Sequence, residues 1–387
     1  MSNEENKNNK LCPLISERKI VKEFLKEGLE SVAVMKYNQK DLLILGYNYS
    51  KFEIYDSTNF ELLAKNPERI DNSINNGTQL SFNTFAIICQ SFIFIYLLST
   101  DYDSVNNKEN YHVALIQTIK FESKDGTTYS FFGLTFSRIF LFDKDLYREK
   151  DDIDMEIIDQ KENADIFGIN NELLVSATIG IVICKRKEPE SEDTFKNMDI
   201  NSYIKYRTEN KYVIKAQITD LEIYDMVQVN YNVIAGTTSK CLCLFSVEKH
   251  ELITKIEAEI SDNCDHILYM LNKDLLCLGG GESISLFSIK DYQFIFTCLV
   301  KSNYRVSEIC ILPDYNILVA IDNYSREYFY QYKCVNYNNE ATKKKKYKLE
   351  EVSNKLMSHQ RGNASMKCLS NNKLVIAIDN EKLQIWE

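Results

Sequence analysis

One spacing recurs along this chain of 387 residues: an apolar run begins, and twelve residues later an aromatic residue closes a second apolar run. The last copy is the clearest, since the run at Leu374 leads through a polar turn to Trp386, the only tryptophan. Five pairs share the spacing, namely Leu43 and Tyr55, Val233 and Phe245, Leu275 and Phe287, Leu318 and Tyr330, and Leu374 and Trp386. Short apolar runs separated by polar turns, without a helical period, predict β-hairpins.

Three weaker copies of the pattern close at Tyr96, Phe142 and Cys184. The eight closing positions lie 41 to 46 residues apart, except for two intervals of 61 and 56 residues. This period matches the length of one four-stranded blade of a β-propeller. The two long intervals contain polar stretches, residues 185–211 and 333–350. We expect both to be surface loops, because added loop length costs little free energy.

The predicted fold is therefore an all-β propeller of seven or eight four-stranded blades. Eight closing positions favour eight blades. The segment Tyr111–Phe121, however, forms either one long strand or parts of two, and a shared strand would reduce the count to seven. The sequence leaves both numbers open. With 44% apolar residues the chain can fill one large core, so we expect a single propeller domain over residues 15–387.

The two ends of the chain should meet in this fold. Residues 1–10 are polar, and we expect residues 1–14 to be a disordered lead-in. The last repeat stops at its third strand, which would leave an exposed sheet edge. We expect the segment Lys19–Lys26 to supply the fourth strand and to close the ring; the alternative is a short helix docked on the propeller. Truncation at residue 28 should then destabilise the whole domain.

The repeat resembles that of the WD40 family, whose units end in an apolar strand, a turn and a strand closing on Trp-Asp. The likeness rests on the closing pairs Trp386-Glu387, Tyr55-Asp56 and Phe142-Asp143. His359 also precedes Leu374 at about the distance of the family's Gly-His element. Asn380 stands where the family usually has Asp, and most of the family's Asp-His-Ser-Trp network is missing. The resemblance implies a WD40-like propeller that assembles multiprotein complexes.

Composition excludes some partners and compartments. A net charge of −10 argues against nucleic-acid binding, which needs a basic surface. The 11 cysteines are odd in number and lie mostly in apolar runs, which predicts a reducing compartment. The N-terminus lacks a signal-peptide core, and the apolar run Phe92–Leu98 is too short to span a membrane. We expect a cytoplasmic protein, with nuclear import through the basic run Lys343, Lys344, Lys345 and Lys346 as the alternative.

No group of residues predicts catalysis or metal binding. The four histidines, His112, His250, His266 and His359, include no pair at metal-ligand spacing. Cys241 and Cys243 lie on one face of a predicted strand, but no second clustered pair exists, so packing is the better interpretation. Gly279–Gly281 lacks the Lys-Ser/Thr of a phosphate-binding loop and predicts a turn with positive φ. We therefore expect no catalytic residue, no metal and no cofactor.

These observations favour a non-enzymatic protein–protein interaction scaffold, a subunit of a larger complex whose partners are other proteins. The stretches 185–211 and 333–350 are the first candidates for binding them. One alternative is a hydrolase or lyase with a site in the central channel, where His266 is the one ionisable candidate on an expected innermost strand. Another is a membrane-recruited propeller, because the sequence from His359 to Gly362 partly resembles the Phe-Arg-Arg-Gly motif of phosphoinositide-binding propellers. Since Arg361 is its only arginine, membrane contact is the weaker expectation.

Overall fold

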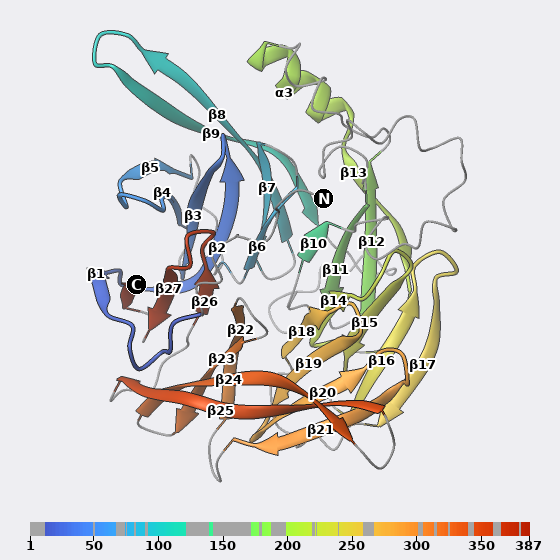
Figure 1. The fold of residues 1–387 in the computed structure, drawn as a ribbon. Helices are drawn as coiled ribbons and strands as arrows, with labels where there is room; N and C mark the ends of the chain where they lie inside the picture. Colours follow the sequence, from blue (N-terminus) through green and yellow to red (C-terminus); the bar gives the residue numbers. More distant parts are fainter. Residues whose placement is uncertain are drawn as a thin grey trace, which may run out of the picture.

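The apolar runs of the sequence form strands in seven four-stranded antiparallel sheets, which are arranged around a common centre (Figure 1). The computed structural model describes residues 12–48, 51–66, 74, 76–80, 83–89, 92–120, 139–141, 172–177, 180–186, 199–218, 221, 223–238, 240–257, 267–300, 305–312, 316–323, 326–339, 344–358, 365–378 and 381–387. Each sheet is one blade of a β-propeller, so the predicted all-β fold class is confirmed.

Six blades follow the chain in order. Blade 1 contains β2 (Leu29–Tyr37), β3 (Lys40–Tyr47), β4 (Phe52–Asp56) and β5 (Leu62–Lys65); blade 2 contains β6 (Asn76–Gln79), β7 (Thr84–Cys89), β8 (Phe92–Asp103) and β9 (Lys108–Lys120). Blade 3 contains β10 (Ile139–Leu141), β11 (Glu172–Ala177), β12 (Gly180–Arg186) and β13 (Tyr212–Gln217); blade 4 contains β14 (Asp225–Gln228), β15 (Val233–Thr237), β16 (Cys241–Ser246) and β17 (Glu251–Glu257). Blade 5 contains β18 (Ile267–Asn272), β19 (Leu275–Gly280), β20 (Ser283–Ser288) and β21 (Gln293–Leu299); blade 6 contains β22 (Arg305–Leu312), β23 (Asn316–Asn323), β24 (Arg326–Asn339) and β25 (Lys344–Ser358).

Blade 7 joins the two ends of the chain. It contains β26 (Ser365–Cys368), β27 (Leu374–Ile378) and β28 (Lys382–Trp386), and its fourth strand is β1 (Ile20–Leu25). Strand β1 pairs antiparallel with β28, so that Ile20 lies opposite Trp386 and Leu25 opposite Lys382. The predicted N-terminal strand in the last blade is therefore present, and the alternative of a docked helix is wrong.

The first strand of each blade is the innermost. First strands contact one another between blades 1 and 2, 2 and 3, 4 and 5, 5 and 6, 6 and 7, and 7 and 1. Blades 3 and 4 meet through a core cluster that includes Ile183, Met226 and Phe245. Contacts thus run from each blade to the next and from blade 7 to blade 1.

The structure decides between seven and eight blades. The segment Tyr111–Phe121 belongs, as far as Lys120, to the single strand β9. The closing position predicted at Phe142 is wrong, because β10 immediately before it is the first strand of blade 3 and pairs with β11. Phe142 itself lies outside the described residues. The sequence is misleading here because the apolar residues of β10 are followed by Phe142-Asp143. That pattern resembles the end of a closing strand in the other repeats.

Burial on both faces explains why the apolar runs are continuous rather than alternating. All described positions of β7, β16, β19, β20 and β27 are buried, because each sheet packs between two neighbouring sheets. Fourth strands are different: β1 and β17 have mainly exposed side chains. A strand buried on both faces needs apolar residues at every position, which produced the signal seen in the sequence.

A β-bulge marks the closing residue of the repeat. Pairing between the third and fourth strands shifts register at Tyr55, Tyr96, Cys184, Phe245 and Phe287, and in blade 7 opposite Trp386. In blade 6 the shifts lie at Tyr328 and Tyr332, two residues before and two residues after Tyr330. A bulge increases the local twist and bends the strand. The closing residue is therefore where the outermost strand turns away from the blade.

The two polar stretches are not simple loops. Residues 333–350 largely belong to β24 and β25, which form a long hairpin, so the predicted loop there is corrected. Tyr332 and Leu349 of this hairpin are buried in the core of blades 5 and 6. Within residues 185–211 the structure contains the end of β12 and the helix α3 (Ile200–Glu209). Residues 1–11 of the predicted lead-in lie outside the described residues.

Several turns contain a residue other than glycine in the left-handed region, including Phe60, Asn107, His250, Asn372 and Tyr292, whose φ values lie between 52° and 64°. The chain has only 12 glycines, so other residue types adopt these turn conformations. Among the described helical residues, none belongs to a helix long and apolar enough to cross a membrane.

Candidate interaction face

The order of strands places the long connections on one face of the propeller. In an antiparallel blade, the first-to-second and the third-to-fourth connections lie at the same end of the sheet, and the second-to-third connection lies at the other end. We call the first of these ends the hairpin face. It carries the outer ends of the β8–β9 and β24–β25 hairpins, and in blade 3 the ends of β12 and β13 that flank helix α3.

The opposite face is different. All seven second-to-third turns contain only two to four residues. The hairpin face also receives the N-terminal segment Cys12–Lys19, because Ile20 lies opposite Trp386 at the end of blade 7. In the part of the chain that the structure describes, the long hairpins and the N-terminal segment thus lie on the same face.

The β8–β9 hairpin projects beyond the blades and has an ordered tip (Figure 1). Asp103 accepts hydrogen bonds from the backbone N–H groups of Val105 (2.9 Å) and Asn106 (3.2 Å), and its other oxygen accepts from the Asn106 side chain (2.7 Å). These hydrogen bonds lower the pKa of Asp103. Tyr102 donates to the Asn107 side chain across the turn. The tip exposes 90% of Val105 and 62% of Tyr102.

The half of this hairpin nearest its tip is attached to blade 1. The Tyr37 and Thr100 hydroxyls are 3.3 Å apart, and the Tyr37 and Tyr111 rings pack at a centroid distance of 6.2 Å. Lys108 forms an ion pair with Glu61 at 2.5 Å. Strand β9 also contacts β5. The hairpin is therefore held by two blades, which limits the motion of its tip.

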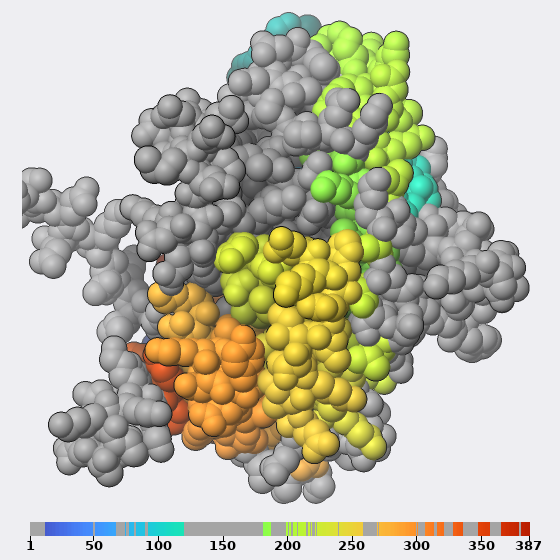
Figure 2. All heavy atoms as spheres, turned by 90° about the vertical axis from the view of Figure 1, so that its right-hand side faces the viewer, coloured from blue at the N-terminus to red at the C-terminus, as the bar shows by residue number. Residues whose placement is uncertain are grey.

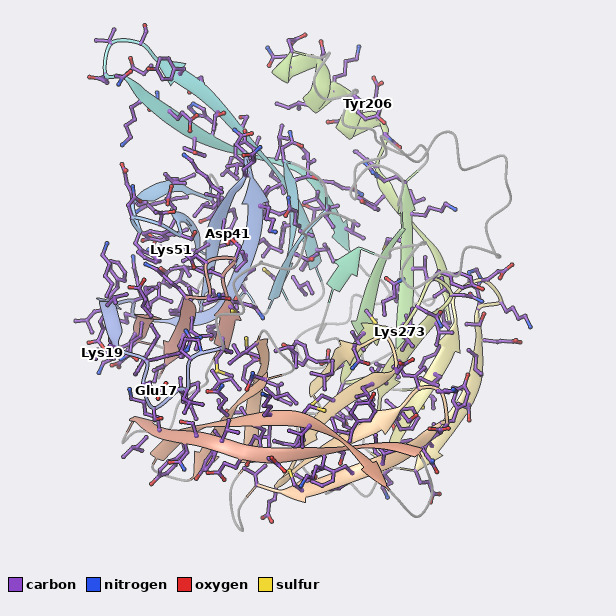
Figure 3. All side chains as sticks on the ribbon, viewed as in Figure 1. Glu17, Lys19, Asp41, Lys51, Tyr206 and Lys273 are labelled. Atoms are coloured by element: carbon purple, nitrogen blue, oxygen red, sulfur yellow. The ribbon has the colours of Figure 1, made fainter. Side chains whose placement is uncertain are left out.

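Helix α3 lies on the other side of β9. Asp199 caps its N-terminus by accepting from the N–H groups of Asn201 (3.0 Å) and Ser202 (3.1 Å). Ile204 and Tyr206 pack against the cluster of blades 2 and 3, and Tyr206 is labelled in Figure 3 where the helix meets the propeller. Figure 2 shows α3 in yellow-green at the top of the molecule, beyond the yellow strands of blade 4.

The β24–β25 hairpin covers the outer edge of blade 5. Strand β25 contacts β21, and the rings of Tyr330 and Tyr332 stack at 6.4 Å. Near its tip Lys348 forms an ion pair with Glu350 at 2.6 Å. Lys344, Lys345 and Lys346 of the predicted nuclear-import run lie in β25, whereas Lys343 lies outside the described residues.

The two histidines that the structure describes do not share a site: His112 lies in β9 of blade 2 and His250 in the turn after β16 of blade 4. His112 is exposed and pairs with Asp101 at 2.6 Å, and His250 occupies a turn with φ of 55°. His266, His359 and Arg361 lie outside the described residues. Across the described part of the chain, no group of three or more His, Cys, Asp or Glu side chains has the geometry of a metal site.

The cysteine pair and the glycine run noted in the sequence both serve the fold. Cys241 and Cys243 are buried in β16, and burial raises the pKa of Cys243 to about 11, so it packs as a neutral thiol. Gly281 has φ of 56° in the turn between β19 and β20, as predicted. Gly279, by contrast, lies in β19 and faces Ile309 of the neighbouring blade.

The tip of the β8–β9 hairpin was not identified in the sequence. Its one signal is the polar run Asp101–Asn107 between two apolar strands, which resembles many other turns of this chain. The concentration of charge in two parts of the sequence was also recognised only in part: residues 142–171 and 187–199 together contain 15 acidic and six basic residues, most of the net charge of −10.

Comparison with known proteins identifies the fold. No protein-family model and no curated protein matches the sequence. Among solved structures 1149 chains match, so the fold is too widely shared to indicate one function. One of them, from the "Crystal Structure of Mitotic Checkpoint Complex", aligns with a TM-score of 0.58 at 9% identity over 100% of this chain and 96% of that chain. The chain therefore has the fold of the WD40-like β-propellers.

Proposed function

We propose that this protein is a non-enzymatic interaction scaffold of the cytoplasm, and that its hairpin face binds partner proteins. The observation that carries the proposal is the β8–β9 tip, where Val105 and Tyr102 are exposed on a turn that Asp103 holds in one conformation. The similar chain comes from a crystal structure of the mitotic checkpoint complex, which is consistent with this role. None of the ten described cysteines forms a disulfide, which supports a reducing compartment for this scaffold.

Order at the tip favours binding for a physical reason. A loop that is already rigid loses little conformational entropy when a partner binds. Tyrosine is enriched among the residues that contribute most binding energy, and such residues usually fill an apolar pocket of the partner. Around the tip lie Asp101, Asp103 and Glu109. The partner should therefore present an apolar pocket with a basic rim.

Quantitative affinity purification from the cells that express the protein tests this function. The test variant is Val105→Asp combined with Tyr102→Ser. The matched control is Tyr292→Ser, because Tyr292 is also an exposed aromatic residue in a third-to-fourth turn, in blade 5 (51% exposed). We expect at least one stoichiometric partner to be lost with the tip variant and retained with the control.

Both variants should have the Tm of the wild type, since exposed substitutions change stability by roughly 0.5 kcal/mol or less. Retention of the full set of partners by the tip variant would remove the β8–β9 tip as the binding site. Metal analysis addresses the enzyme alternative, because a stoichiometric bound metal ion would favour a catalytic propeller.

A further inference from the structure

Two cysteines meet where the N-terminal segment packs on the propeller. Cys12 lies in this segment, and Cys368 ends β26 in blade 7. Both pack against the same core cluster, which also contains Ile15 of the N-terminal segment and Met366 of β26. The sequence separates the two thiols by almost the whole chain, and only the folded propeller brings them to one place.

Exposure distinguishes this pair from most other cysteines. Of the ten described cysteines, only Cys12, Cys298 and Cys368 are partly exposed, and the other seven are buried. Cys298 lies in β21 of blade 5 and packs in a different cluster. Cys310 is near Cys368 but is buried. Cys12 and Cys368 are therefore the neighbouring thiols that a dissolved oxidant can reach.

A buried guanidinium lies beside the two thiols. Arg18 is only 2% exposed; its Nη1 donates to the carbonyl of Asn372 at 2.8 Å, and its Nη2 is 4.0 Å from Cys12 Sγ. Burial raises the pKa of Cys368, while the charge of Arg18 opposes that increase and the neighbouring Cys12 adds to it. A guanidinium at this distance stabilises a thiolate, the reactive form of cysteine.

We propose that Cys12 and Cys368 are a site of reversible oxidation, at which a peroxide forms a disulfide that ties the N-terminal segment to blade 7. The Cys12 thiolate attacks one oxygen of hydrogen peroxide, breaks the O–O bond and becomes a sulfenic acid, releasing hydroxide. The Cys368 thiolate then attacks the sulfenic sulfur and expels a second hydroxide. The two hydroxides take up the two protons lost by the thiols, so two thiols and one peroxide give one disulfide and two waters.

The disulfide would act on the segment that completes the propeller. In the reduced protein this segment is held by non-covalent contacts: the Ile15 N–H donates to Gln331 (2.7 Å), Ser353 donates to the Ser16 hydroxyl (2.7 Å), and Lys355 donates to the Arg18 carbonyl (2.8 Å). Figure 3 labels Glu17 and Lys19 where the segment passes between β25 and β1. A disulfide at Cys12 would keep the N-terminal segment attached to blade 7. Strand β1, which follows this segment, would then stay paired with β28 as the fourth strand of the blade.

Peptide mapping of the full-length protein after treatment with hydrogen peroxide tests the proposal. We expect the intact monomer to lose two hydrogen masses, a single cross-linked peptide pair containing Cys12 and Cys368, and reversal by dithiothreitol. Oxidised protein should also have a higher Tm than reduced protein. Cys12→Ser and Cys368→Ser should each abolish both effects, whereas Cys298→Ser should preserve them.

Two results would overturn the proposal. One is a disulfide between Cys310 and Cys368 in place of the expected pair. The other is oxidation of Cys12 to sulfinic acid without any cross-link, while Cys368 remains a free thiol. Neither measurement depends on the interaction proposed for the β8–β9 tip.

Discussion

Gln117 and the backbone of Tyr212 exchange two hydrogen bonds between blades 2 and 3. The Gln117 Nε2 donates to the Tyr212 carbonyl at 2.7 Å, and the Gln117 Oε1 accepts from the Tyr212 N–H at 2.9 Å. The same arrangement joins blades 1 and 2, where the Gln79 side chain exchanges two hydrogen bonds with the backbone of Lys36, at 2.9 and 2.7 Å. At each of these two junctions, a glutamine side chain thus makes the pair of hydrogen bonds with the backbone that a neighbouring strand would make within a sheet.

Gln117→Ala should lower the free energy of unfolding by ~1–3 kcal/mol, because it leaves a donor and an acceptor of the Tyr212 backbone without their partners. Urea titration followed by far-UV circular dichroism measures the change. Thr118→Ala is the matched control, since Thr118 is the exposed neighbour in β9 and should change stability by less than roughly 0.5 kcal/mol. Equal effects of the two substitutions would contradict a role for the Gln117 hydrogen bonds.

Ile15→Ala should destabilise the protein by about 2–4 kcal/mol, because Ile15 is fully buried between blades 6 and 7 and its removal leaves a cavity. Trp386, the single tryptophan, belongs to the same cluster, so its fluorescence reports unfolding of this region directly. Leu25→Ala serves as the control, because Leu25 in β1 is 78% exposed. If Ile15→Ala lowered the free energy of unfolding no more than Leu25→Ala does, the N-terminal segment would contribute little to stability.

Glu53 should make stability depend on pH at the junction of blades 1 and 7. Burial opposes its ionisation, but hydrogen bonds from Tyr55, Tyr47 and Lys26 outweigh burial and lower its pKa to about 2. A carboxylate with a depressed pKa stabilises the folded state fully above its ordinary pKa of 4.5, and the stabilisation is lost as the pH falls towards 2. Lys26 directly follows β1 and donates to Glu53 in β4 of blade 1. Protonation of Glu53 would therefore weaken the contact between the N-terminal strand and blade 1.

The test compares the wild type with Glu53→Gln by denaturant unfolding between pH 7 and pH 3. At neutral pH the variant should be less stable by about 3 kcal/mol, taking ~1.4 kcal/mol for each unit of pKa change. The difference should shrink as the pH falls below 4.5, the ordinary pKa of Glu53. A difference that is constant over this range would assign the effect to packing rather than to charge.

Gly279→Ala should destabilise the protein by ~1–3 kcal/mol through overpacking. A Cβ atom at this position would collide with the end of the Ile309 side chain and lie 3.0 Å from Val306 Cγ1, both in β22 of the next blade. Ile309→Val removes the colliding methyl group, so the double variant should recover part of the loss measured by thermal unfolding. Additive effects of the two substitutions would show that residues 279 and 309 do not interact.

Local patterns were sufficient for most of the strands. The twelve-residue spacing predicted the second and third strands because both faces of a blade are buried, so these strands are apolar throughout. In blades 1 and 7 the paired residues lie directly opposite one another, as for Leu43 and Tyr55 and for Leu374 and Trp386. In blades 4, 5 and 6 the register differs by one residue, so that Ile234 rather than Val233 lies opposite Phe245. The spacing therefore identified the hairpins and not their exact pairing.

The candidate face could not be predicted in the same way. The β8–β9 tip consists of residues that form an ordinary turn, and its importance comes from the length of its two strands and from their attachment to blade 1 through Tyr37 and Lys108. Those contacts join segments distant in sequence. The partners of Gln117 and Cys12 are also distant, at residues 212 and 368, and no local pattern indicates them.

By itself the sequence determined that the chain is a propeller, because strands buried on both faces impose apolar patterns within a few tens of residues. It favoured the segment Lys19–Lys26 as the last strand over a docked helix, and the pairing of β1 with β28 confirmed that choice. Only the tertiary structure decided that there are seven blades, since the role of β10 depends on its pairing with β11 across 30 intervening residues. It also decided that the long hairpins β8–β9 and β24–β25 point to one face. That arrangement follows from the alternating direction of paired strands, which the apolar pattern of a single strand does not contain.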